Sequence, residues 1–70
     1  MSDMADLISF PSEPMPIQGK WYWVVAWPGD EGQRGMYTGG TGATMPPFVD
    51  ANWRPVGLAH CWYRELRPGE

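Results

Sequence analysis

Apolar and aromatic residues alternate along two stretches of this chain, which are separated by segments rich in glycine and proline. The stronger stretch, KWYWVVAW, covers residues 20–27; it follows Gly19 and stops at Pro28 and Gly29. β-branched and aromatic residues dominate it, as they do in β-strands. Because both of its alternating faces are apolar, the pattern predicts a strand in the middle of a sheet.

Shorter stretches predict the strands that pair with this central one. The turn PGDEG leads into a strand over residues 33–38, so we expect an antiparallel hairpin. Residues 48–49 start a short strand, and a last strand runs over residues 58–66 before Pro68 and Gly69. We therefore predict a mainly all-β fold, with a small antiparallel sheet of three to five strands that is either half-open or curled into a small barrel.

The N-terminal segment differs in composition from the rest. We predict an extended, proline-rich arm over residues 1–18, partly ordered, and a single small β domain over residues 19–70. Some apolar residues of the arm could anchor it on the domain or on a neighbouring subunit: Leu7, Ile8 and Phe10.

Five tryptophans are unusual in a chain of 70 residues. Tryptophan is hard to bury completely, and its indole N–H needs a hydrogen-bond partner. Trp21, Trp23 and Trp62 fall inside predicted strands, so we expect them to build the packed face of the sheet. Trp27 and Trp53 fall at strand ends, where an indole can remain partly exposed.

The net charge of −3 comes from the first thirteen residues, which contain three acids and no base. The remaining residues hold five acids and five bases, so the predicted domain is neutral. A long nucleic acid normally requires a basic surface, and a protein that mimics DNA would need more acids. We therefore expect neither.

Several further classes of protein are disfavoured by composition. No run approaches the roughly 20 apolar residues that cross a bilayer, and no signal sequence is visible, so we expect a cytoplasmic protein with no membrane partner. One cysteine and one histidine leave no typical metal site, and we expect no cofactor. Since so small a domain lacks a disulfide or metal to stabilise it, we expect a homodimer or a higher homo-oligomer.

Cys61 is the candidate nucleophile of any enzyme here, with His60 as its neighbour. If both lie in a strand, their side chains point to opposite faces. A small buried cysteine is the more ordinary interpretation. We therefore predict no catalytic residues and no enzymatic activity.

Three stretches carry a resemblance to a known group of proteins: PMPIQGKWYWVVAW, GQRGMYTGG and AHCWYRELRP. Together they resemble short phage and prophage accessory proteins of uncharacterised function. Cys61 interrupts the usual His–Trp pair of that pattern. The resemblance suggests a phage-encoded accessory protein and implies no catalytic residues.

Aromatic rings, arginines and a glycine-rich loop together suit a small anionic ligand with an aromatic ring. Indoles stack on such a ring, arginines bind phosphate or carboxylate through paired N–H groups, and glycines allow close backbone approach. The candidate binding residues are Trp27, Trp53, Arg34, Arg54, Tyr37, Gly39, Gly40, Thr41 and His60.

Two functions are consistent with these residues. The first is a non-enzymatic, anti-defence type of binding protein that sequesters a nucleotide-like anion. The alternative is an inhibitor or adaptor that blocks a host protein complex, because Trp, Tyr and Arg are also the residues enriched at interface hot spots.

Overall fold

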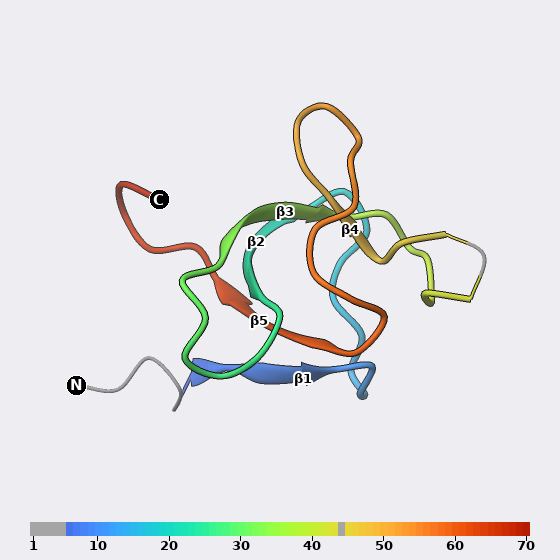
Figure 1. Ribbon diagram of the computed structural model, residues 1–70, viewed down its shortest axis with the longest axis horizontal. Helices are drawn as coiled ribbons and strands as arrows, with labels where there is room; N and C mark the ends of the chain where they lie inside the picture. The colour runs from blue at the N-terminus through green and yellow to red at the C-terminus, as the bar shows by residue number, and fades with distance from the viewer. Residues whose placement is uncertain (1–5, 44) are drawn as a thin grey trace.

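A computed structural model describes residues 6–43 and 45–70, so the first five residues of the predicted arm lie outside the described part. The described chain is all-β, as the sequence predicts. Its five strands are β1 (Ile8–Phe10), β2 (Trp21–Val25), β3 (Gln33–Tyr37), β4 (Phe48–Val49) and β5 (Cys61–Glu65). They form one antiparallel sheet in the order β1-β5-β2-β3-β4, and the sheet curls strongly (Figure 1).

The central position predicted for the KWYWVVAW stretch is confirmed, because β2 pairs with both β3 and β5. In this register Trp23 lies opposite Arg34 on one side and Arg64 on the other. The strand ends at Val25, since the next backbone N–H, that of Ala26, donates to Asp30 Oδ2 at 3.1 Å. A side-chain oxygen thus takes the place of the backbone carbonyl that would accept this N–H in a continued sheet.

Part of the predicted arm is a strand. β1 pairs with β5, which places Ile8 opposite Tyr63 and Phe10 opposite Cys61. Three residues are too few to show a strand pattern, and their partner lies some fifty positions away along the chain. The pairing therefore depends on tertiary structure rather than on local sequence.

The core is a cluster of aromatic rings inside the curl. The Phe10 and Phe48 rings lie 5.5 Å apart, and those of Tyr22 and Tyr63 lie 5.1 Å apart, both edge to face. Such pairs contribute about 0.5–1.5 kcal/mol each beyond the area that they bury. Phe10 belongs to β1 and Phe48 to β4, the two opposite edges of the sheet, so their contact requires the sheet to curl. The buried residues of this cluster are Phe10, Tyr22, Val24, Tyr37, Phe48, Val56, Cys61 and Tyr63.

The prediction that Trp21, Trp23 and Trp62 build the packed face of the sheet was wrong. Tyr22 and Val24 of β2, with Tyr63 of β5, line the core, whereas Trp21, Trp23 and Trp62 point to the other face and stay only half-buried. Both faces of β2 are apolar, so alternation alone does not distinguish them. The concave side of a strongly curled sheet holds phenyl and phenol rings, and the wider indoles lie on the outside.

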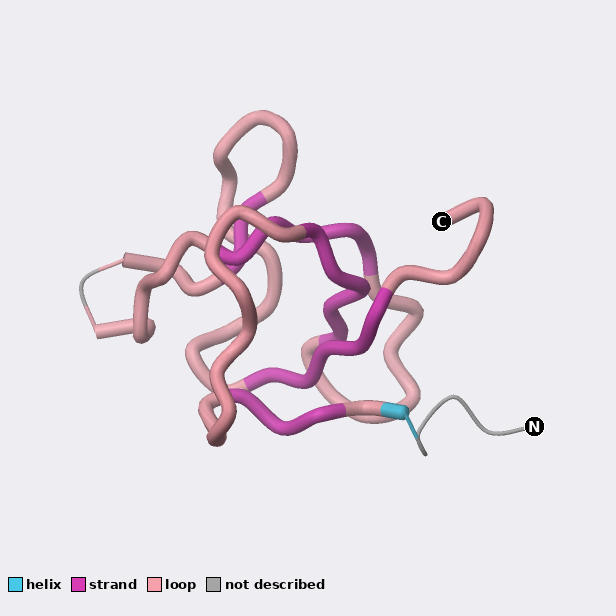
Figure 2. Tube along the Cα trace, turned by 180° about the vertical axis from the view of Figure 1, so that it is seen from behind, coloured by secondary structure: helices cyan, strands magenta, loops and turns pink. Residues whose placement is uncertain are grey.

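The ends of the last strand also differ from the prediction of residues 58–66, because β5 begins at Cys61 and ends at Glu65. Residues before it form bends, with Gly57 at a φ of +74°. Figure 2 shows how much of the chain consists of loops around the short strands. Among the described residues, no helix is long and apolar enough to cross a membrane.

Replacing Phe48 by alanine tests the aromatic core. Phe48 is 0% exposed and contacts four other core rings, so Phe48→Ala should lower the free energy of unfolding by about 3–5 kcal/mol. Urea denaturation followed by tryptophan fluorescence measures the change. Leu58→Ala is the matched control, since Leu58 is exposed and its loss should change the value by less than about 0.5 kcal/mol. Equal effects of the two variants would contradict this core assignment.

Candidate functional site

A tight loop between β4 and β5 holds the most exposed tryptophan of the described chain. Asp50 organises the loop: its Oδ1 accepts the backbone N–H groups of Asn52 at 2.8 Å and of Arg54 at 3.0 Å. The Asp50 N–H donates to the Arg54 carbonyl, and the Trp53 N–H donates to the Asp50 carbonyl, both at 2.9 Å. These bonds fix the loop in one shape, as an aspartate at the start of a turn commonly does.

Trp53 occupies an unfavourable backbone conformation in this loop. Its φ is +63°, the one positive value found for a described residue other than glycine, and the residue is 67% exposed. The left-handed region costs a bulky L-residue roughly 1–2 kcal/mol, which a glycine would not incur. Because the indole is exposed, packing of Trp53 in the core does not account for a tryptophan at this position.

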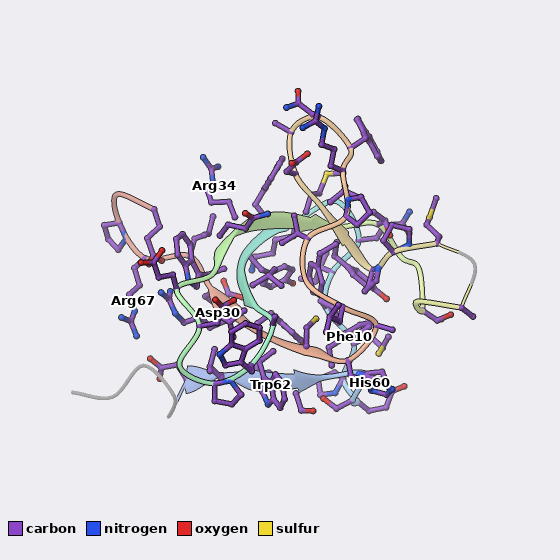
Figure 3. All side chains as sticks on the ribbon, viewed as in Figure 1. Phe10, Asp30, Arg34, His60, Trp62 and Arg67 are labelled. Atoms are coloured by element: carbon purple, nitrogen blue, oxygen red, sulfur yellow. The ribbon has the colours of Figure 1, made fainter. Side chains whose placement is uncertain are left out.

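Beside this loop, the outer face of the sheet contributes an indole and a guanidinium. The guanidinium carbon of Arg34 on β3 lies 5.3 Å from the centre of the Trp21 ring on β2. Arg34 itself projects away from the sheet (Figure 3). A shallow depression of about 340 Å³ is lined by Trp21, Arg34, Asp50 and Ala51, so it joins the sheet to the loop. We call this depression, together with the adjoining turn that Asp50 holds, the tryptophan–arginine surface. Its residues are Trp21, Arg34, Asp50 and Ala51 in the depression, and Trp53 and Arg54 in the turn.

The two arginines of this surface differ from the other described cations. Lys20 pairs with Glu65 at 2.8 Å, Arg64 with Glu70 at 2.6 Å, and Arg67 with Asp6 at 2.8 Å. Among the described residues, no carboxylate forms an ion pair with Arg34 or Arg54. The positive charge that remains uncompensated in the described chain is therefore located here.

A second region surrounds the hairpin turn between β2 and β3. The Trp23 indole N–H donates to the Glu31 carbonyl at 3.1 Å, and Arg64 lies over the Trp23 ring at 5.4 Å. A Cβ at Gly32 would come within 2.6 Å of Trp23 Nε1, so only glycine allows the turn to approach the indole this closely. The adjacent pocket of about 260 Å³ is lined by Leu7, Trp23, Val25, Gly29, Asp30, Glu31 and Arg64. Its two carboxylates, and the pairing of Arg64 with Glu70, disfavour an anionic ligand here.

The predicted binding residues are thus divided between separate parts of the molecule. Arg34, Trp53 and Arg54 share the tryptophan–arginine surface. Trp27 is 58% exposed but belongs to the acidic hairpin turn. His60, also exposed, lies just before β5 and well away from Arg34 (Figure 3).

The glycine-rich loop uses several of its polar groups in hydrogen bonds within the loop. Tyr37 is buried in the core and its hydroxyl donates to the Gly40 carbonyl at 3.2 Å, so its ring is not available for stacking. The Gly40 N–H donates to Thr38 Oγ1, and the Gly42 N–H donates to the Met45 carbonyl. Gly39 and Thr41 are exposed between these bonds. The amides of Gly40 and Gly42 are thus used within the loop, and a binding role of Gly39, Gly40 and Thr41 stays a prediction.

Sequence reasoning missed Trp21 and Asp50. The sequence predicts Trp21 on the packed face and does not place Asp50 among the candidate binding residues. The signal for Asp50 was present in the sequence VDANW, because an aspartate followed by small and polar residues favours a turn held by its own side chain. No local pattern indicated the outward direction of Trp21.

Cys61 and His60 do not form a catalytic pair within the chain, because Cys61 is buried in the core and His60 is exposed. Burial raises the pKa of the Cys61 thiol to about 11. In the described part of the chain, no three residues among His, Cys, Asp and Glu are grouped so as to hold a metal ion.

No protein-family model, curated protein or solved structure matches this chain. The candidate site therefore rests on the geometry of this molecule.

The thiol of Cys61 should react slowly in the native protein. A pKa of about 11 rather than 9 lowers the thiolate fraction at pH 8 about 100-fold, and burial also blocks access to the sulfur. Labelling with a chromogenic disulfide at pH 8, with and without denaturing urea, measures this ratio. A native rate similar to the unfolded rate would show that Cys61 is an accessible, activated thiol.

Stability should depend on the ionisation of Glu70. Hydrogen bonds from the Arg64 guanidinium and the Arg67 backbone lower the pKa of Glu70 to about 2, from an ordinary 4.5. The ionised carboxylate therefore stabilises the fold fully above pH 4.5, and this contribution is lost as the pH falls from 4.5 towards 2. Urea midpoints measured over this range should fall less steeply for Glu70→Gln. Glu13→Gln is the control: Glu13 is exposed, and its variant should follow the wild-type profile.

Proposed function

We propose that this chain is a non-enzymatic binding protein that attaches to a partner protein through the tryptophan–arginine surface. The observation that carries the proposal is Trp53, an exposed indole held at a φ of +63° by a rigid loop. Tryptophan and arginine are the residues that most often dominate the energy of protein interfaces. A rigid loop also limits the entropy that is lost on binding.

The shape of the surface supports a protein partner rather than a small ligand. Ligand pockets typically enclose 70–90% of a small molecule in about 300–1,000 Å³. The depression beside Trp21 holds about 340 Å³, but only four residues line it, and Arg34 already lies over the Trp21 ring. A nucleotide-like ligand would have to displace that guanidinium before it could stack there.

Binding of a nucleotide-like ligand stays the alternative function. It depends on nine residues acting together, and three of these residues, Arg34, Trp53 and Arg54, lie on the surface that we propose. An origin as a phage accessory protein, and a role in blocking a host defence complex, likewise stay predictions from the sequence.

Replacing Trp53 by glycine should separate binding from stability. Trp53→Gly removes the indole and relieves the left-handed backbone, so the free energy of unfolding should stay the same or rise by about 1 kcal/mol. Affinity purification from a lysate of the producing cells should recover one protein in stoichiometric amount with the wild-type chain, and should lose it with Trp53→Gly. Leu58→Ala, which changes an exposed side chain elsewhere, should retain it.

Three results would count against this function. The wild-type chain could recover no partner protein, or Trp53→Gly could recover the same amount of partner as the wild type. The third is a thermal shift of the wild-type chain with one nucleotide in a panel of mononucleotides, cyclic dinucleotides and ADP-ribose derivatives. A nucleotide shift that disappears in Trp53→Gly would instead support the ligand alternative. Lower stability of Trp53→Gly would show that the indole has a structural role.

A further inference from the structure

We infer that the partner presents an acidic peptide segment to the tryptophan–arginine surface, with carboxylates that bind Arg34 and Arg54 and an apolar or aromatic side chain that packs on the exposed indole. The inference rests on the proposed function and specifies the chemistry of the partner. It starts from charge, because these two arginines are the described cations that form no ion pair within the described chain.

Arg34 has guanidinium N–H groups available for such a carboxylate, because it forms no ion pair within the described chain. Its guanidinium carbon lies 5.3 Å from the centre of the Trp21 ring. The N–H donors of a guanidinium lie in its plane and point outward, in the fork that matches a carboxylate. Stacking on the indole also restricts the side chain before binding, which lowers the entropy lost when the pair forms.

Arg54 is placed near the same depression by its backbone. Its N–H and carbonyl both hydrogen-bond to Asp50, a residue that lines the depression together with Arg34. The Asp50 carboxylate is the one negative group of the surface. Because its Oδ1 accepts two backbone N–H groups, part of its charge is compensated inside the loop. The two positive charges of the surface therefore exceed its one negative charge.

The balance of charge in the whole chain favours a short acidic segment over a nucleic acid. A nucleic acid binds along a row of cations, and its affinity depends on neutralising many phosphates. Here the net charge is −3, and two of the acids that contribute to it, Asp30 and Glu31, line the pocket at the hairpin turn. Arg34 and Arg54, which form no ion pair within the described chain, can bind a local acidic motif, but two cations do not form a continuous basic track.

Selection from a random library of twelve-residue displayed peptides tests this inference. The library is selected on the immobilised wild-type chain and counter-selected on Trp53→Gly. The recovered peptides should be enriched in Asp and Glu beside a large apolar or aromatic residue. Fluorescence polarisation with the most enriched peptide should give a Kd about tenfold weaker for Arg34→Gln and for Arg54→Gln. Lys20→Gln is the matched control, since Lys20 is already paired with Glu65, and its Kd should stay within about twofold of wild type.

The outcomes distinguish this inference from the proposed function. Enrichment of neutral or basic peptides that still require Trp53 would overturn the acidic partner and leave the protein-binding function standing. Equal affinity of Arg34→Gln, Arg54→Gln and wild type would do the same. Failure to enrich any peptide that requires Trp53, or preferential binding of a twelve-nucleotide oligothymidine, would overturn both.

Discussion

The contact between Phe10 and Phe48 is the constraint on which the rest of the structure depends. These rings come from opposite edges of the five-stranded sheet, and they meet at 5.5 Å only because the sheet curls. The curl creates a concave face just wide enough for phenyl, phenol and valine side chains. It also gives this small domain a continuous aromatic core, at a size where a hydrophobic core alone often supplies little stability.

The same curl divides the aromatic residues by size and position. Phenylalanine and tyrosine pack inside, edge to face, while the tryptophans remain on the outside. Three of these indoles differ in what covers them. The hairpin turn and Arg64 cover Trp23, Arg34 lies over Trp21, and Trp53 is 67% exposed. The exposure of each ring therefore depends on the loops and side chains beside it.

Loops rather than strands determine where binding can occur. Asp30 and Asp50 each use a side-chain oxygen to hold a turn, one over the outer face of β2 and one beside β4. The first turn adds negative charge next to Trp23. The second holds Trp53 and Arg54 by backbone hydrogen bonds to Asp50, which lines a depression together with Arg34. The two ends of the outer face consequently have opposite electrostatic character, although both are built from tryptophan and arginine.

Alternation of apolar residues and the positions of glycine and proline determined much of this protein in advance. They predicted the all-β class, the central strand and the hairpin, because these features depend on neighbouring residues. Tertiary structure alone decided which face of β2 is buried, that residues 8–10 pair with β5, and that Trp21 joins Arg34 and Asp50. Those outcomes depend on register and on contacts between distant segments. A strand that is apolar on both faces carries no local signal for which face is buried.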